Sequence, residues 1–495
     1  MNVNQRRPLF RRRPQSNIYR MFLWIVMLLG GVWMLQQMDK GEIKPLFQET
    51  PIPTRSVESL VSEGSASFSA GKVQAAITAY QEAVELDPNN AKIWTELARI
   101  QTYSSTFLIT NPEKKARLLE ALESANKAVE LAPEDSMSHA IRAFVLDWNA
   151  NPFFNTAEQS QAYLIEAEQE ALIAQQLDNT NTLALAYYAE ILVDQQKWNQ
   201  AEIIMQQVFE HEDADQLMDV HRVNALVLET LGDYNLAITE YDKAIAIEPN
   251  FTFLYRLAGA NYRTLAAKIP NPQAARPVYE TSLEYFAKAV NINEQIGVKD
   301  PGPHLSIART YSQLGEFFIA ARNVQTALEY EPNNSDIYGQ LGVIYFRSRN
   351  YEGSIFSLKC ATYGCSGEDS CKGRGLDKCY PDLNENPQDV PGLEIAPNSI
   401  VYYYTYGSVL AALSRPKDNN CPEAMQVLQE VRDELEANPE DYTDARDTIL
   451  FDIVEPSEFI CQDLAAGNVT DLSIQTGTAT SEVIMDLTPT PSSTP

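Results

Sequence analysis

Hydrophobic residues between positions 301 and 334 recur at three- and four-residue steps, which predicts two short amphipathic helices joined by a tight bend. One face of the first helix carries His304, Ile307, Ala308 and Tyr311, and one face of the second carries Phe317, Ala320, Val324 and Ala327. Gly315 and Pro332 follow the two segments, and residues of these types end helices. Two helices this short cannot bury both apolar faces by themselves, so the pattern predicts further copies on either side.

The same pattern returns along the chain, with small, aromatic and proline residues in matching places. The copy at residues 218–251 has Ala225, Leu228, Gly232, Tyr234, Ala237, Tyr241, Ala244 and Pro249, and further copies occupy residues 57–90, 182–215 and 335–365. These residues and their spacing, 34 positions as in the unit 301–334, resemble the tetratricopeptide repeat (TPR) family. The resemblance implies an all-α fold, a right-handed α-solenoid of about nine helix pairs plus a closing helix pair. It also implies an inner groove that binds segments of other proteins.

A different pattern stands at the N-terminus, where residues 21–35 are apolar without a polar interruption. With its flanks this stretch reaches roughly 31 Å as a helix, close to the hydrocarbon thickness of a bilayer. Six arginines precede it, so the positive-inside rule predicts a single-pass anchor with a cytoplasmic N-terminus and extracytoplasmic repeats. The alternative is a cleaved signal peptide, which needs small residues at the cleavage site, whereas Gln36 and Gln37 follow here.

These patterns divide the chain into seven segments. They are a cytoplasmic basic segment (1–20), a transmembrane signal anchor (21–38), a proline-containing linker (39–55), the TPR solenoid (56–363), a Cys-rich loop (364–399), the last TPR with closing helices (400–466) and a disordered Ser/Thr/Pro tail (467–495). The closing pair is expected to break at Pro456. In the second, third and sixth repeats the second helix arrives eleven or twelve residues late. We expect these insertions to add turns shared by the two helices, or to be neutral elaboration.

All six cysteines lie in the last third of the chain: Cys360, Cys365, Cys371, Cys379, Cys421 and Cys461. An even number clustered in an irregular region predicts disulfides in an extracytoplasmic protein. Cys421 and Cys461 both fall early in the second helix of successive pairs, so we predict that they bond to each other. Three pairings stay open for the other four. All six would stay reduced if the membrane orientation were the opposite one.

Candidate catalytic chemistry is sparse. Three of the four histidines, His139, His221 and His304, fall in one repeat position that Trp94, Tyr255, Tyr338 and Tyr403 fill elsewhere, so they are predicted to be packing groups. The sequence has no phosphate-binding loop, no dinucleotide fingerprint and no H-E-x-x-H zinc motif. We therefore predict no enzymatic activity, no cofactor and no metal. The net charge of −29 also disfavours nucleic-acid binding.

In the TPR family the first helix of each pair lines the groove. Here the groove-facing positions of four repeats carry Arg222, Arg256, Arg263, Arg309 and Arg347. Five arginines on an acidic protein predict a strip that docks carboxylates of an extended partner segment. The alternative is that these arginines pair with acids of the adjacent repeat.

The first hypothesis for function is thus a membrane-anchored, extracytoplasmic TPR scaffold that binds proteins. A second is an enzyme with a site in the Cys-rich loop. The loop has no histidine and no usual nucleophile–base pair, which argues against this hypothesis. A third is a cell-envelope polysaccharide binder, in which tyrosines such as Tyr402, Tyr403 and Tyr404 would stack on sugars.

Overall fold

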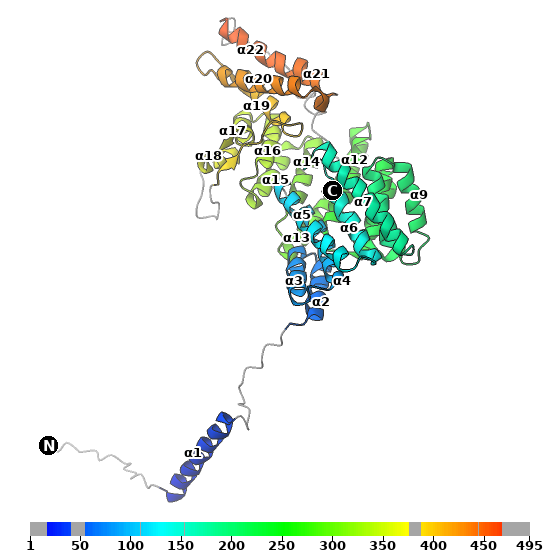
Figure 1. Ribbon diagram of the computed structural model, residues 1–495. Helices are drawn as coiled ribbons and strands as arrows, with labels where there is room; N and C mark the ends of the chain where they lie inside the picture. The colour runs from blue at the N-terminus through cyan, green and yellow to red at the C-terminus, as the bar shows by residue number, and fades with distance from the viewer. Residues whose placement is uncertain are drawn as a thin grey trace, which may run out of the picture. The chain divides into compact units, whose positions relative to one another are not determined.

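A computed structural model describes residues 17–40, 55–108, 110–152, 154–375, 388–443 and 445–467. The chain divides into two compact units, Met1–Ser56 and Val57–Pro495 (Figure 1). Most of the predicted basic segment, most of the linker and nearly all of the predicted tail lie outside the described residues. The predicted segment boundaries there stay predictions.

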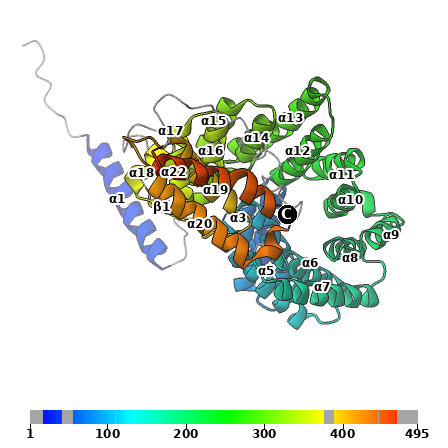
Figure 2. The same ribbon diagram turned by 90° about the horizontal axis from the view of Figure 1, so that it is seen from above.

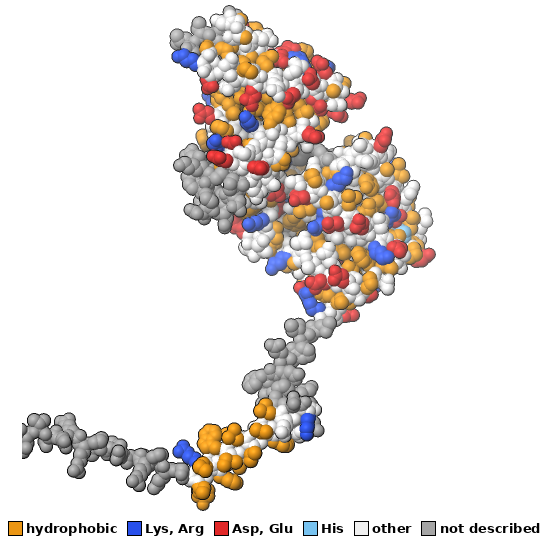
Figure 3. All heavy atoms as spheres, turned by 60° about the vertical axis from the view of Figure 1, so that its left-hand side comes forward, with side chains coloured by type: hydrophobic (Ala, Val, Ile, Leu, Met, Phe, Trp, Pro, Cys, Tyr) orange, Lys and Arg blue, Asp and Glu red, His pale blue; other side chains and the backbone are white. Residues whose placement is uncertain are grey.

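The described part of the first unit is one helix, α1 (Ile18–Asp39). Its stretch Ile18–Gln37 has a mean hydropathy of 1.8, and none of it is buried in the structure. Side chains such as Trp24 and Leu28 are more than 60% exposed. Figure 3 shows hydrophobic side chains along this helix. By length and composition the helix fits a membrane span or a signal sequence.

The second unit is an α-solenoid of consecutive helix pairs, as the repeat pattern predicts. The pairs are α2 (Val57–Ser69) with α3 (Val73–Leu86), α4 (Ala91–Ser104) with α5 (Asn111–Leu131), α6 (Ser136–Asn149) with α7 (Ala157–Leu177), α8 (Thr182–Asp194) with α9 (Trp198–Val208), α10 (Met218–Leu231) with α11 (Tyr234–Ile247), α12 (Thr252–Ala267) with α13 (Pro272–Ile296), α14 (Gly302–Gln313) with α15 (Phe317–Tyr330), α16 (Ser335–Arg347) with α17 (Tyr351–Thr362), and α19 (Ile400–Leu413) with α20 (Cys421–Ala437). Short 3-10 turns η1 (Ser105–Phe107) and η2 (Ala214–Gln216) follow α4 and α9.

Small residues allow the helices of a pair to approach each other closely. A Cβ atom added at Gly64 of α2 would lie 2.5 Å from the Tyr80 ring of α3, and one added at Gly259 of α12 would lie 2.5 Å from Phe286 of α13. Both distances are below van der Waals contact, so these positions require glycine for the observed packing.

The insertions lengthen one helix of a pair, not both equally. The second helices α5 and α7 have 21 residues and α13 has 25, against 14 in α3, α11 and α15. The first helices α4 and α6 keep 14 residues and α12 has 16. The expectation of turns shared by both helices is therefore wrong for α6–α7, where α7 alone is lengthened. A new N-cap explains this, because Thr156 forms a capping box with Gln159 and starts α7 early.

The solenoid curves until its first pair meets its sixth (Figure 2). The Phe68 and Phe251 ring centroids lie 5.6 Å apart, and the Asn250 side chain donates a hydrogen bond to the Ser69 carbonyl at 3.0 Å. One hydrophobic core joins residues of α2 to α4 with Phe251, Phe253 and Leu254. The superhelix therefore closes on itself here.

The Cys-rich region has more regular structure than predicted. Strands β1 (Gly364–Cys365) and β2 (Val390–Pro391) pair antiparallel, and a short helix α18 (Gly367–Gly373) follows β1. The loop expected at residues 364–399 thus contains a strand pair and one short helix, which Ser366 caps by accepting from the Asp369 N–H. Residues 376–387 lie outside the described residues.

The expected closing helix pair is one helical run instead. After a 3-10 turn η4 (Pro439–Tyr442), the run passes through α21 (Arg446–Thr448), a π-helix η5 (Ile449–Val454) and α22 (Glu455–Ala465). Pro456 does not break it, because it lies in the first turn of α22 next to the π-helix, where the N–H it lacks is not needed.

Candidate functional site

The structure pairs Cys421 with Cys461, the pair expected from the sequence, across a Cα–Cα distance of 5.4 Å. It also pairs Cys360 with Cys365, which ties the end of α17 to β1. Cys371 is disulfide-bonded, and Cys379 lies outside the described residues. These bonds fasten α22 to α20 and the strand pair to the solenoid.

The structure buries Arg222 in the centre of the closed superhelix. Only 2% of this residue is exposed, and its two terminal nitrogens donate to both Glu190 carboxylate oxygens at 2.7 and 2.6 Å. Its Nε donates to the Tyr103 hydroxyl at 3.0 Å. For this residue the alternative from the sequence holds, because it pairs with an acid of the preceding repeat. We remove Arg222 from the predicted docking strip.

A second ion pair beside it spans the superhelix. Asp219 of α10 accepts from the Arg99 guanidinium of α4 at 2.5 Å and from the Tyr187 hydroxyl at 2.9 Å. Burial alone would raise the pKa of Asp219, but Arg99 and Arg222 together lower it below its usual value. Arg99 and Asp219 are 120 residues apart in sequence. The contact therefore depends on the closure of the superhelix.

Arg256 is also partly committed to the structure. Its Nη1 donates to the carbonyl of Thr106 at 3.1 Å and lies 3.8 Å from an Asp300 carboxylate oxygen. Lys114 of α5 lies near it, and burial together with the charge of Arg256 lowers the pKa of this lysine. Charged groups of both signs from two parts of the chain therefore meet at this point.

Arg263 and Arg309 form the part of the predicted strip that lacks acidic partners. The Arg263 guanidinium lies 5.6 Å from the Phe286 ring centroid and donates to the Ser306 carbonyl at 3.4 Å. Burial, and then the positive charge of Arg309, lower the pKa of Arg263 to about 10. Arg309 is exposed. Among the described residues, no Asp or Glu oxygen lies within 4.0 Å of either guanidinium.

Arg347 of α16 is half-buried, and burial lowers its pKa. Arg263, Arg309 and Arg347 come from the first helices α12, α14 and α16 of successive pairs. We call these three residues the cationic strip. A carboxylate bound along the strip would stabilise the charged forms of Arg263 and Arg347, which burial disfavours.

Two of the histidines, His139 and His221, share a structural role that the repeat alignment only partly predicted. In five repeats the side chain in this position bonds the carbonyl six residues earlier, just before the first helix. The pairs are Trp94 with Pro88, His139 with Pro133, His221 with Asp215, Tyr255 with Pro249, and Tyr338 with Pro332. The other nitrogens of His139 and His221 contact Glu170 and Glu240 of the second helix at 2.6 and 2.7 Å. These imidazoles therefore brace each repeat internally.

The tyrosines of the polysaccharide hypothesis are buried. Tyr402, Tyr403 and Tyr404 are 6%, 5% and 1% exposed, and Tyr402 donates to Asp336 at 2.6 Å. They have no face available for stacking on a sugar, so this signal for polysaccharide binding was wrong. The reason is that α19 is covered on all sides, by α16 and α17, by α20 and by α22.

Consecutive helix pairs with close small-residue contacts define an α-solenoid. Three family models identify the type of repeat. The model "TPR repeat" matches residues 64–101, and models named "Tetratricopeptide repeat" match residues 225–251 and 305–358. The chain therefore contains tetratricopeptide repeats.

Relatives are distant. Anaphase-promoting complex subunit 3 of Schizosaccharomyces pombe (strain 972) is 26% identical over 123 residues, which are 25% of this chain and 16% of that protein. The chain thus matches only about a sixth of the length of this curated relative. A thermophilic TPR protein of Thermus thermophilus is 17% identical, with a TM-score of 0.34 over 42% of this chain and 98% of the other. A human IFIT1 dimer with PPP-AAAA is 17% identical, with a TM-score of 0.45 over 77% and 91%.

Proposed function

We propose that the protein is a membrane-anchored, extracytoplasmic TPR scaffold that binds other proteins through the concave surface of its solenoid and has no catalytic activity. The TPR class carries the protein-binding part of this proposal, since TPR proteins generally bind other proteins or peptides. The cationic strip supplies its most specific feature, a partner segment that presents carboxylates.

Two observations support the location. Five arginines precede the exposed apolar helix α1 and a sixth, Arg20, lies in its first turn, the arrangement of an anchor whose N-terminus stays in the cytoplasm. The disulfides Cys360–Cys365 and Cys421–Cys461 belong to an oxidising compartment, which is the side of the membrane that this orientation gives to the solenoid.

The partner is best described by the charge it must carry. Arg263 is half-buried and has no carboxylate within ion-pair distance among the described residues, and the neighbouring charge of Arg309 disfavours its cationic form further. A carboxylate bound between them would accept charge-assisted hydrogen bonds from both. An extended segment along α12, α14 and α16 would place several such groups in sequence.

Site-directed photo-crosslinking in native membranes tests the proposal with the full chain. We would place a benzophenone amino acid at Gln313, one turn beyond Arg309 on α14, and in a separate chain at Phe318, which is 80% exposed on α15. We expect a discrete protein adduct at Gln313 and none at Phe318. Arg309→Glu should reduce the adduct about tenfold, because it replaces an attractive charge by a repulsive one.

The matched control is Arg322→Glu, since Arg322 is an exposed arginine on the second helix α15 of the same pair. It should leave the Gln313 adduct unchanged. An adduct that forms equally at both positions, or that survives Arg309→Glu at full yield, would show that the concave surface is not the binding surface.

A further inference from the structure

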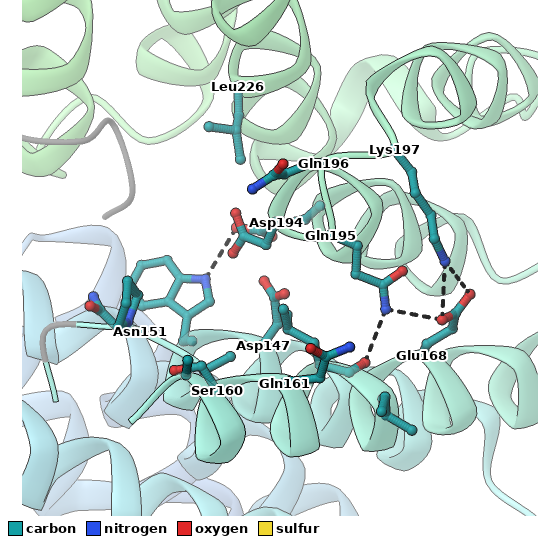
Figure 4. Close-up of a pocket in the computed structure, with 17 residues that line it drawn as sticks. Asp147, Asn151, Ser160, Gln161, Glu168, Asp194, Gln195, Gln196, Lys197 and Leu226 are labelled. Carbon is teal, nitrogen blue, oxygen red and sulfur yellow. Dashed lines mark hydrogen bonds and ion pairs between the residues drawn. The ribbon is translucent and has the colours of Figure 1, made fainter. Parts of the chain in front are cut away.

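The lengthened α7 of the third pair builds a cavity of about 600 Å³ at the bend edge of the solenoid (Figure 4). The end of α6, the α6–α7 loop and the first half of α7 form one wall. The end of α8, the turn that leads to α9 and Leu226 of α10 form the other. The N-terminal turns of α7 that the insertion adds are therefore part of the cavity itself.

Four carboxylates line this cavity, and two of them have cationic partners. Glu190 is paired with Arg222, and it also accepts from the Trp148 indole N–H at 3.1 Å. Glu168 lies 3.3 Å from Lys197 at the rim. Asp147 of α6 and Asp194 of α8 remain, and Figure 4 shows their carboxylates pointing into the cavity.

Asp147 is 3% exposed, and neither of its carboxylate oxygens has a hydrogen-bond partner among the described residues. The Ser160 hydroxyl and the Gln195 side-chain oxygen, which line the same cavity, are also unpartnered within the described part of the chain. Gln195 uses its amide nitrogen to donate to Glu168 at 3.0 Å, which leaves its oxygen free to accept. Buried polar atoms normally find partners, so four such atoms around one cavity indicate a ligand that donates hydrogen bonds.

The charge of these groups defines the ligand further. Burial, and then the nearby carboxylate of Asp194, raise the pKa of Asp147 well above its usual value. Burial, and then Glu190, raise the pKa of Asp194 to about 7. Burial is the larger cause of both shifts, and the neighbouring carboxylates add to it, so a cation bound beside Asp147 and Asp194 would offset both causes. The described residues have no group of three His, Cys, Asp or Glu side chains placed to hold a metal ion, so an organic cation fits the site better.

We propose that this cavity binds a primary ammonium group on an alkyl chain, carried by a lysine side chain of a partner or by a free diamine, with Asp147 and Asp194 as its counter-charges. An ammonium has three donors that point in different directions, which matches acceptors from α6, α7 and the α8–α9 turn better than the planar fork of a guanidinium. Trp148, Leu164 and Ile165 supply apolar wall for the alkyl chain. This site is distinct from the cationic strip and does not depend on it.

Calorimetric titration of the full chain in detergent micelles tests the site. The probes are Nα-acetyl-lysine methylamide, the neutral Nα-acetyl-norleucine methylamide, and 1,4-diaminobutane. We expect at least one of the two amines to bind and the norleucine compound not to bind. Asp147→Asn and Asp194→Asn should each weaken binding at least about tenfold, because each removes one counter-charge. Glu158→Gln is the matched control, since Glu158 is an exposed acid on α7 outside the cavity lining, and it should have no effect.

A measurement on the unaltered protein keeps the test independent of how the variants fold. The groups that face the cavity are Asp147, Glu168, Glu190, Asp194, Lys197 and, behind Glu190, Arg222. An ammonium bound among them lowers the pKa of the two uncompensated aspartates. Binding near pH 6.5 should therefore release protons, which titrations in buffers of different ionisation enthalpy count.

If 1,4-diaminobutane binds more tightly than the lysine probe, the ligand is a free polyamine. If the lysine probe binds more tightly, the ligand is a lysine side chain of a partner. Three outcomes would overturn the proposal. The first is that neither amine binds at about 10 mM. The second is that the Asp147→Asn and Asp194→Asn variants bind an amine as tightly as the unaltered protein does. The third is that an amine binds without releasing protons.

Discussion

Replacing Arg222 by methionine should destabilise the solenoid more than replacing any exposed arginine. The substitution keeps most of the side-chain volume but removes a bidentate pair with Glu190, a bond to Tyr103 and a buried cation next to the acidic cavity. Both members of the pair are 2% exposed or less, so Glu190 would be left as an uncompensated buried charge. Breaking a buried pair in this way costs about 3–5 kcal/mol of unfolding free energy.

Urea denaturation of the full chain in detergent, followed by far-ultraviolet circular dichroism, measures this change. The control is Arg276→Met, because Arg276 is 48% exposed and its pair with Glu316 is a surface pair that should contribute less than about 1 kcal/mol. Adding Glu190→Gln to Arg222→Met should recover part of the loss, about 1–3 kcal/mol, since the stranded charge is then gone. Equal stability of the Arg222→Met and Arg276→Met variants, or no recovery in the double variant, would refute the buried-pair argument.

Three further outcomes follow from the structure. The pKa of Asp194, raised to about 7, means that the folded state holds a proton that the unfolded state releases near pH 4, so this residue opposes folding increasingly as pH rises from about 4 to 7. At pH 8 the Asp194→Asn variant should therefore have an unfolding free energy about 2–4 kcal/mol higher than that of the unaltered protein. Urea titrations should show this difference shrinking toward pH 5, and a difference that does not change with pH would contradict the raised pKa. Substituting Cys421 and Cys461 by serine should lower unfolding free energy by about 2–4 kcal/mol and should expose α22 to early proteolysis, whereas reduction without any effect would show that α22 is held by packing alone. His221→Tyr should be tolerated while His221→Ala should cost about 1–3 kcal/mol, because a phenol can also bond the Asp215 carbonyl; equal melting temperatures for the two variants would disprove the bracing role.

The sequence by itself determined everything that depends on the repeat period. Apolar residues at helical steps identified the helix pairs, and aligned positions placed His139, His221 and Tyr255 in one structural role. The same alignment brought Cys421 and Cys461 to one edge, where the structure joins them. Within a repeat and between neighbours the spacing of residues along the helix sets which side chains meet, so local pattern is sufficient.

Only the tertiary structure decided what meets across a turn of the superhelix. Arg99 and Asp219 join because small rotations between repeats, accumulated over several pairs, bring the first two pairs against the fifth and sixth. The repeat pattern does not specify this accumulated rotation. The sequence therefore could not predict that Arg222 is buried while Arg309 is exposed. The cavity at Asp147 was also missed, although it lies between successive helix pairs. Its signal was the late second helix of the third repeat, but only the folded chain shows that the added turns of α7 face two carboxylates from neighbouring helices.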